Sequence, residues 1–138
     1  YVAPGKRPRS TIAPVIVFRA GRPVFAIGIP GAARIPTAML QALLDRLTLG
    51  RPLAAAIGDT RIHFNRNWRR NGEESIEAET SLPETEAAAL RRLGWKVMLA
   101  EPAGTGRLFG GINAVEFVPG GGYVGYADPR RTNHAAGY

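Results

Sequence analysis

The sequence predicts an α+β fold in which helices pack against antiparallel strand pairs. Two apolar, β-rich runs at residues 15–18 and 24–27 are separated by a glycine-containing turn. A second such pair, at residues 112–117 and 123–126, flanks Pro119 and three glycines. Between the pairs, apolar residues recur at the three- and four-residue spacing of helices. A chain of 138 residues that is 45% hydrophobic is long enough to bury one ordinary core.

The first half of the chain reads as a loop, a hairpin and two helices. Residues 1–14 are rich in proline and predict a loop, and Pro30 with Gly31 ends the second strand. From Pro36 the period becomes helical and stops at Gly50. We expect five apolar side chains to fix this helix onto the sheet: Met39, Leu40, Leu43, Leu44 and Leu47. A short second helix is expected over residues 52–57.

The middle of the chain is more polar. Residues 61–64 predict a brief strand, and residues 65–80 predict a surface excursion with an extended piece near Ile76. Residues 81–84 resemble a capping box with proline in the first turn of a helix. That helix is expected to end at Gly94, a good residue for a helix terminus.

The last third of the chain is expected to complete the sheet. Residues 95–99 read as a strand, residues 104–111 as a flexible connection ahead of the second hairpin, and the tail from Asp128 as irregular. Neither an internal repeat nor a linker divides the sequence. It is therefore interpreted as one domain unit.

Composition excludes several classes of function. The net charge of +7 invites a nucleic-acid interpretation. The one dense basic cluster, residues 66–70, is followed at once by four glutamates that partly cancel its field, so we expect no nucleic-acid partner. No apolar run approaches the ~20 residues of a membrane-spanning helix. The absence of cysteine excludes disulfides and thiolate catalysis, and with only two histidines we expect no metal and no cofactor.

Two segments near the start carry the strongest chemical signal. Residues 5–14 present the hydroxyls of Ser10 and Thr11 on a loop, and residues 28–35 open a helix through a glycine turn. Hydroxyls and bare backbone N–H groups arranged in this way can surround a carboxylate or a developing oxyanion. The same residues are also consistent with hydroxyls that cap local backbone groups and with an ordinary strand-to-helix turn.

These segments resemble the small subunit of γ-glutamyltranspeptidases, which are N-terminal-nucleophile hydrolases. That subunit typically reads P-x-K-R-P-x-S-S-M-S-P, G-S-P-G-G-S-R-I, P-R-F-H-H, S-D-P-R and A-G-Y. Matching stretches occur here in the same order, at residues 5–14, 28–35, 60–63, 127–130 and 136–138. The resemblance implies part of an αββα four-layer sandwich with antiparallel sheets, completed by residues outside this chain.

The resemblance also implies site residues. Ser10 and Thr11 correspond to two serines that bind the α-carboxylate of the γ-glutamyl donor, and Thr11 retains the hydroxyl. Gly31 and Ala32 correspond to two glycines whose backbone N–H groups form the oxyanion hole. An alanine resists the positive φ that glycine adopts, so Ala32 bears on the geometry of that hole.

Other polar residues in the matching segments are interpreted as structural. Arg34 could attract an anionic substrate or could pair with a buried carboxylate and brace the glycine turn, and we favour the structural role. Arg61 and His63 match the family pattern only in part, and His63 is read as a hydrogen-bonded structural residue. Asp128 and Arg130 are expected to pair or cap near the C-terminus.

The resemblance implies part of a bacterial, autoprocessed enzyme. Such enzymes cleave or transfer the γ-glutamyl group of glutathione-type amides through an acyl-enzyme on an N-terminal threonine. In the family that threonine lies well upstream of the serine pair, whereas only nine residues precede Ser10 here. We therefore expect residues 1–138 to be one partial domain, the C-terminal portion of the small subunit, which is inactive alone.

The expected partners are the large subunit and the upstream part of the small subunit from the same precursor, with a small γ-glutamyl or related amide as substrate. The resemblance suggests a bacterial periplasmic or extracellular location. Two alternatives stay open. One is a divergent amidohydrolase or cephalosporin acylase-like enzyme, and the other is a non-catalytic relative.

Overall fold

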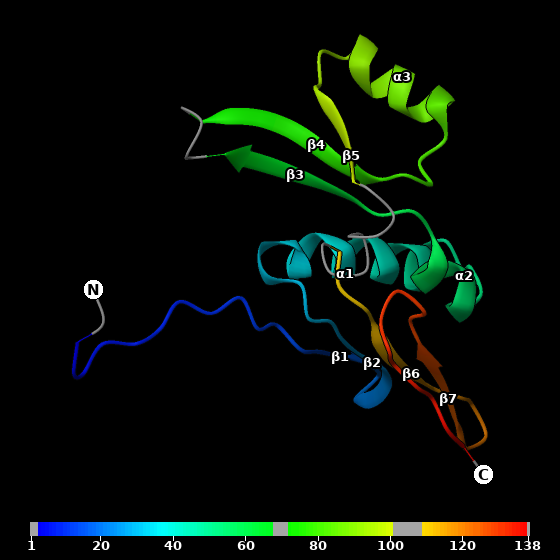
Figure 1. The fold of residues 1–138 in the computed structure, drawn as a ribbon. Helices are drawn as coiled ribbons and strands as arrows, with labels where there is room; N and C mark the ends of the chain where they lie inside the picture. The colour runs from blue at the N-terminus through cyan, green and yellow to red at the C-terminus, as the bar shows by residue number, and fades with distance from the viewer. Residues whose placement is uncertain (1–2, 68–71, 101–108, 138) are drawn as a thin grey trace.

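Two β-sheets alternate with helices along one axis of the molecule. The computed structural model describes residues 3–67, 72–100 and 109–137. Figure 1 shows a four-stranded sheet with α1 and α2 on one face, a three-stranded sheet beyond these helices, and α3 beyond the three-stranded sheet. Helices thus pack on the faces of sheets whose strand pairs are mainly antiparallel, as the predicted α+β class implies.

The two predicted hairpins lie side by side in one antiparallel sheet. Its strands run in the order β1-β2-β6-β7 and comprise Val15–Arg19, Arg22–Gly28, Asn113–Phe117 and Tyr123–Ala127. The hairpins join where Phe25 pairs with Glu116 and Ile27 with Ala114. The second half of the sequence therefore returns to the strands of the first half.

Alternation along these strands divides the sheet into a covered and an open face. Phe25, Ile27 and Ala114 are buried against the helices. Ile16 pairs with Ala26, and Ala26 pairs with Val115, so Ile16 and Val115 share the opposite face, where both are exposed. Within residues 3–67, 72–100 and 109–137, no helix is laid against that open face.

The first helix covers the inner face of this sheet but uses different residues from those predicted. A 3-10 turn, Ala32–Arg34, leads into α1, Ile35–Leu43, which continues as a π-helical turn, Leu44–Thr48. Of the five expected contacts Met39 is buried and Leu43 and Leu47 are partly buried, whereas Leu40 and Leu44 are exposed.

The prediction for Leu40 and Leu44 was wrong because the buried stripe follows other positions at the same helical spacing. These positions are Ile35, Ala38, Met39 and Ala42. α2, Leu53–Gly58, follows as predicted and buries Leu53, Ala56 and Ile57.

The second sheet corrects the prediction of a polar surface excursion. β3, Ile62–Asn67, and β4, Glu73–Glu79, form an antiparallel hairpin, and β5, Val97–Ala100, pairs with β4 in parallel. β4 is therefore a central strand, and its buried residues are Ser75, Ile76, Ala78 and Glu79. The prediction of a surface excursion was wrong because polar side chains of β4 form hydrogen bonds and ion pairs with residues of other elements. The β4–β5 pair also departs from the expectation of purely antiparallel sheets.

α3, Glu84–Arg92, packs Ala87 against Ala78 and Leu82. The predicted capping box does not form, because Pro83 occupies the cap position and no side chain caps the helix. The hydroxyl of Ser81 instead lies 2.8 Å from that of Thr60. The predicted end at Gly94 is confirmed, since this residue takes a φ of 90° and donates to the Arg91 carbonyl.

Two predictions fall outside the described residues in whole or in part. These are the flexible connection at residues 104–111 and the basic cluster at residues 66–70. In the described ranges, no helix has the length and apolar character that crossing a bilayer requires.

Candidate functional site

The Gly31–Ala32 turn links β2 to α1 through a strained backbone. Ala32 has a φ of 50°, in the left-handed region that side-chain-bearing residues rarely adopt. Gly31, with a φ of 166°, is extended. A left-handed conformation costs an alanine about 1–2 kcal/mol. Alanine thus adopts a conformation that the sequence analysis expected it to resist, and such strain gathers at functional sites.

Two contacts hold this turn from opposite ends. The backbone N–H of Arg34 donates to the Gly31 carbonyl at 3.0 Å and closes the 3-10 turn. The Pro30 carbonyl oxygen occupies the space beside Gly110, where a Cβ would lie only 1.7 Å from it. Gly110 also has a φ of 75°, so glycine is required there for both space and conformation.

Arg34 has the structural role that the sequence indicated. Its guanidinium donates to Glu77 on β4, with Nε 2.9 Å from Oε2 and Nη2 bonded to the same oxygen. The guanidinium carbon also lies 6.0 Å from the centre of the Phe109 ring. The residue that ends the 3-10 turn is therefore anchored to the second sheet.

His63 joins the same group of residues. Its Nδ1 lies 2.9 Å from the hydroxyl of Thr37 on α1, and that hydroxyl also donates to the Arg34 carbonyl at 3.2 Å. Burial lowers the pKa of His63 below its ordinary value, and the nearby Arg34 charge lowers it further, although Glu77 opposes the shift. His63 therefore favours the neutral form and acts as a bridge from α1 to β3.

Ser10 and Thr11 lie on the segment that precedes β1. Figure 1 shows this segment extending away from the sheets. The Ser10 hydroxyl is exposed and accepts a hydrogen bond from the Ile12 N–H at 3.2 Å, which is a local turn of the kind that serine often forms. Among the described residues, no hydrogen bond joins Ser10 or Thr11 to the Gly31–Ala32 turn.

The hairpin register nevertheless directs both segments to one end of the sheet. Val15, the first residue of β1, pairs with Ile27, near the end of β2. Ser10 and Thr11 lie four to five residues before Val15, and Gly31 lies four residues after Ile27. Both segments therefore leave the sheet at the same end. Convergence of Ser10, Thr11, Gly31 and Ala32 on one pocket stays a prediction.

A buried charge network connects the C-terminal segment to both sheets. Asp128, just after β7, has no exposed surface, and its Oδ2 lies 2.5 Å from Nη2 of the buried Arg61. Burial raises the pKa of the Asp128 carboxyl, but the backbone N–H groups of Arg130 and Ile112 and the Arg61 charge outweigh this effect. The net pKa lies below its usual value, which keeps Asp128 ionised.

Arg130 completes this network. Its guanidinium forms a bidentate pair with the buried Glu79 of β4, at 2.5 and 2.6 Å. The Arg130 backbone N–H donates to Asp128, as expected for a pair near the C-terminus. Neither Glu79 nor Glu77 was predicted from the sequence as a site residue. Their signal was the period-two alternation of Ser75, Glu77 and Glu79 with Ile76 and Ala78.

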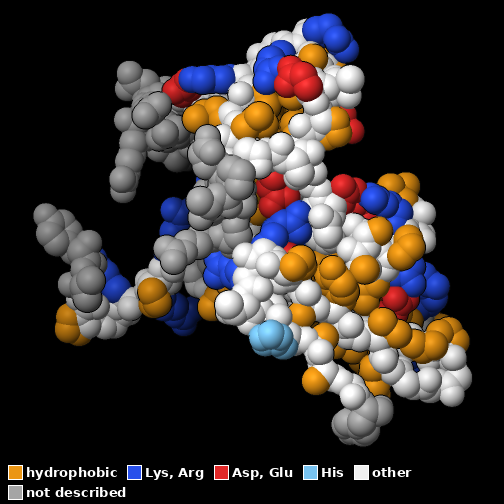
Figure 2. All heavy atoms as spheres, turned by 45° about the vertical axis from the view of Figure 1, so that its right-hand side comes forward, with side chains coloured by type: hydrophobic (Ala, Val, Ile, Leu, Met, Phe, Trp, Pro, Cys, Tyr) orange, Lys and Arg blue, Asp and Glu red, His pale blue; other side chains and the backbone are white. Residues whose placement is uncertain are grey.

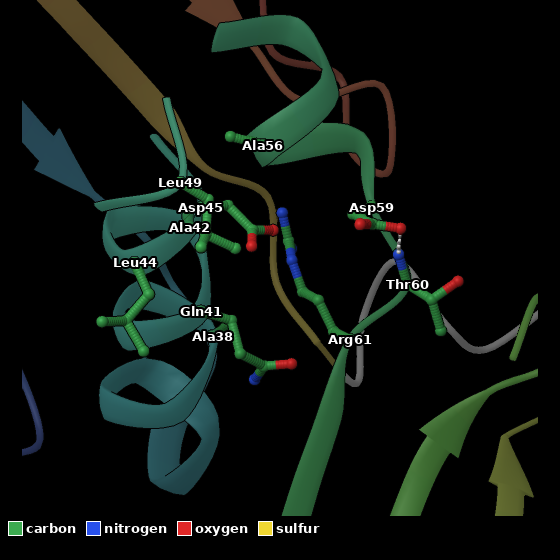
Figure 3. Close-up of a pocket in the computed structure, with 10 residues that line it drawn as sticks. All are labelled: Ala38, Gln41, Ala42, Leu44, Asp45, Leu49, Ala56, Asp59, Thr60 and Arg61. Carbon is green, nitrogen blue, oxygen red and sulfur yellow. Dashed lines mark hydrogen bonds between the residues drawn. The ribbon is translucent and has the colours of Figure 1, made fainter. Parts of the chain in front are cut away.

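Two neighbouring cavities lie between α1 and the start of β3. One, of about 300 Å³, is drawn in Figure 3, where Arg61 extends between α1 and α2 and Asp59 accepts from the Thr60 N–H. The other, of about 560 Å³, opens between α1, β3 and α3, where Figure 2 shows the molecule hollowed. Ser10, Thr11, Gly31 and Ala32 line neither cavity, so the predicted site is separate from both.

The described part of the chain holds no group of three or more histidine, aspartate or glutamate side chains arranged to bind a metal ion.

Known proteins are similar to this chain over nearly its whole length. A sequence model of the gamma-glutamyltranspeptidase family matches residues 1–138. The "Acylase ACY 1 proenzyme" of Pseudomonas sp. (strain SE83) is 36% identical over 126 residues, which are 91% of this chain and 20% of that protein. The "Glutathione hydrolase proenzyme" of Pseudomonas sp. (strain A14) is 33% identical over an alignment of 141 positions that covers 99% of this chain and 24% of that protein.

Solved structures match as well. Gamma-glutamyltranspeptidase from Pseudomonas nitroreducens, complexed with L-DON, matches with a TM-score of 0.79 at 27% identity, over 99% of this chain and 66% of that one. This likeness confirms the α+β class and the N-terminal-nucleophile fold. The chain spans only a fifth to a quarter of the length of the two curated relatives named above. Because the family model covers every residue, the chain belongs to the gamma-glutamyltranspeptidase family.

Proposed function

We propose that this chain is the C-terminal portion of the small subunit of a γ-glutamyltranspeptidase-like enzyme. The enzyme cleaves or transfers the γ-glutamyl group of glutathione-type amides, and the attacking N-terminal threonine lies upstream of residues 1–138. The acyl group passes to that threonine and then to water or to an amino acid. The relatives that carry the names glutathione hydrolase and gamma-glutamyltranspeptidase support this assignment.

The observation that carries the proposal is the left-handed backbone of Ala32. In the proposed mechanism the N–H groups of Gly31 and Ala32 stabilise the negative oxygen of the tetrahedral intermediate. One such donor is typically worth about 3 kcal/mol in the transition state, more than the strain that alanine pays for this conformation. The hydroxyls of Ser10 and Thr11 hold the donor carboxylate at the same end of the sheet.

The open face of the four-stranded sheet supports the proposed partners. Ile16 and Val115 are exposed on this face. Val115 pairs with Gly125, and Tyr123, two residues before Gly125, lies on the same face with 72% of its surface exposed. Large exposed apolar patches mark sites that bind other proteins, membranes or ligands, and here we infer a face that other polypeptide covers. We assign the cover to the upstream part of the small subunit and to the large subunit of the same precursor.

A second candidate function is favoured by one observation. The acylase relative is 36% identical to this chain, and Ala32 replaces the second glycine of the γ-glutamyltranspeptidase pattern. A glutaryl amide has a carboxylate where a γ-glutamyl amide has its α-carboxylate, but it lacks the α-amino group. Ser10 and Thr11 suit either acyl group, so these two residues do not discriminate between the substrates.

The test uses the full-length precursor after maturation. Turnover of γ-glutamyl p-nitroanilide is compared with that of glutaryl p-nitroanilide. A higher kcat/KM for the γ-glutamyl substrate supports the main proposal, whereas a higher value for the glutaryl substrate supports the acylase. Ser10→Ala and Thr11→Val are expected to raise KM about tenfold or more, because hydrogen bonds to a charged carboxylate are strong. Thr85→Ala, exposed on α3, is the control. Failure to turn over either amide would contradict both candidates.

A further inference from the structure

We propose that Glu77 is a positioning residue that orients the backbone N–H of Ala32 through Arg34. The inference rests on the proposed function, in which this N–H faces the developing oxyanion. It assigns a residue of the three-stranded sheet a role in positioning the Gly31–Ala32 turn.

The first step is the peptide between Gly31 and Ala32. A trans peptide is planar, and its C=O and N–H point in opposite directions. The Gly31 carbonyl accepts the Arg34 N–H at 3.0 Å, and the peptide between Gly31 and Ala32 is trans. Holding the Gly31 carbonyl against Arg34 therefore turns the Ala32 N–H to the other side of the turn. The direction of that N–H depends on where Arg34 is held.

The second step is the anchor of Arg34. Glu77 takes both Nε and Nη2 of the guanidinium on one carboxylate oxygen, and its other oxygen accepts from Asn65 Nδ2 at 2.7 Å. The Glu77 side chain is only 15% exposed, so the pair is largely shielded from water. Glu77 lies on β4, and its side chain is also held by Asn65 of β3. It is therefore a rigid support for the Arg34 guanidinium.

The third step is the main chain of Arg34. Its carbonyl accepts from the Thr37 hydroxyl, which in turn contacts His63. His63 pairs with Glu77 across the β3–β4 hairpin. On this hairpin, Glu77 therefore holds the side chain of Arg34, and the neighbouring His63 holds its carbonyl through Thr37. A shift of the hairpin would move the turn, and a misplacement of about 1 Å can lower a rate about a hundredfold.

The matched control lies on the same strand. Glu74 also pairs with an arginine, Arg66, at 3.7 Å, but its side chain is 48% exposed. Among the described residues, no hydrogen bond or ion pair joins Glu74 to the Gly31–Ala32 turn. Glu77→Gln and Glu74→Gln thus remove the same charge from β4. Only the first loosens the anchor of Arg34.

The experiment measures kcat and KM of the mature full-length protein on the better of the two p-nitroanilides. Glu77→Gln is expected to lower kcat about tenfold to a hundredfold with KM changed less than twofold, because the oxyanion forms only in the transition state. Glu74→Gln is expected to match wild type. A boronic acid analogue of the acyl group, which forms a tetrahedral anion on the nucleophile, should lose affinity in Glu77→Gln by the same factor as kcat/KM.

The outcomes separate the two hypotheses. If wild type turns over an amide and Glu77→Gln equals Glu74→Gln, the positioning role is wrong and the proposed function stands. If wild type turns over neither amide, the proposed function is wrong and the positioning role falls with it. Where Glu77→Gln does not mature, Glu77→Asp, which retains the charge at shorter reach, is measured. A wild-type boronate affinity in that variant would overturn the inference.

Discussion

The carbonyl oxygen of Pro30 occupies the place where any residue but glycine would put a Cβ at position 110, at a separation of 1.7 Å. The two residues are 80 positions apart, yet the backbone of Pro30 leaves no room for a side chain at position 110. A carbonyl is part of the main chain and cannot rotate away as a side chain can. The turn that precedes Ala32 therefore depends on a glycine just ahead of β6.

Gly110→Ala is expected to destabilise the mature protein by about 2–4 kcal/mol, because the new methyl group collides with backbone and the φ of 75° is strained for alanine. The measurement is the midpoint of thermal unfolding. Gly58→Ala, at the end of α2 with no atom within 4 Å of the added Cβ, is the control and should be neutral or slightly stabilising. Equal midpoints for the two variants would contradict the packing.

Ala32→Gly is expected to stabilise the protein by about 1 kcal/mol, because glycine adopts the left-handed backbone without the penalty that alanine meets. The neighbouring Ala33→Gly should have the opposite sign and lose about 0.5–1 kcal/mol, since Ala33 lies inside the 3-10 turn and is not at positive φ. Unfolding in urea measures both. The same sign for both variants would exclude the strained conformation of Ala32.

Stability is expected to depend on pH through His63, whose pKa is lowered first by burial. Above the unfolded value of about 6.5, both states hold a neutral imidazole and stability is complete. As the pH falls below about 6.5, the unfolded chain binds a proton first, and stability is lost until the folded pKa is reached. Thermal unfolding at pH 7.5 and 5.5 measures this loss.

His63→Gln should reduce that difference between the two pH values, whereas His134→Gln, at the exposed second histidine, should leave it unchanged. The prediction concerns the slope against pH and not the absolute stability, which both variants can alter. An undiminished slope in His63→Gln would show that other groups cause the dependence.

Asp128→Asn is expected to destabilise the protein by about 3–5 kcal/mol, because it leaves the guanidinium of Arg61 buried without its paired charge. Asp45→Asn is the matched control. Asp45 pairs at 3.3 Å with the more exposed Arg51, and its loss should cost less than about 1 kcal/mol. Chemical unfolding compares the two. If Asp128→Asn destabilises the protein no more than Asp45→Asn does, the buried charge of Arg61 does not depend on Asp128 for its stabilisation.

Local pattern was enough to predict several elements. Both hairpins, the helix from Pro36, α2 and the end of α3 at Gly94 follow from spacing and from turn residues, which act over a few positions. The family motifs are local too, so the order of Ser10, Gly31, Arg61 and Asp128 could be compared without coordinates. The backbone strain at Ala32 could also be anticipated, because alanine disfavours positive φ whatever its tertiary surroundings.

Tertiary structure decided what depends on partners distant in the chain. The segment from Glu73 to Glu79 resembles a solvated loop in composition, and it becomes a central strand because Arg34 neutralises Glu77 and Arg130 neutralises the buried Glu79. Leu40 and Leu44 fit a helical stripe, but the sheet lies against Ala38 and Ala42 instead. The support of the Gly31–Ala32 turn by Gly110 and Glu77 has the same origin: a contact between segments 40 to 80 residues apart is fixed by packing and charge in three dimensions, and no local spacing encodes it.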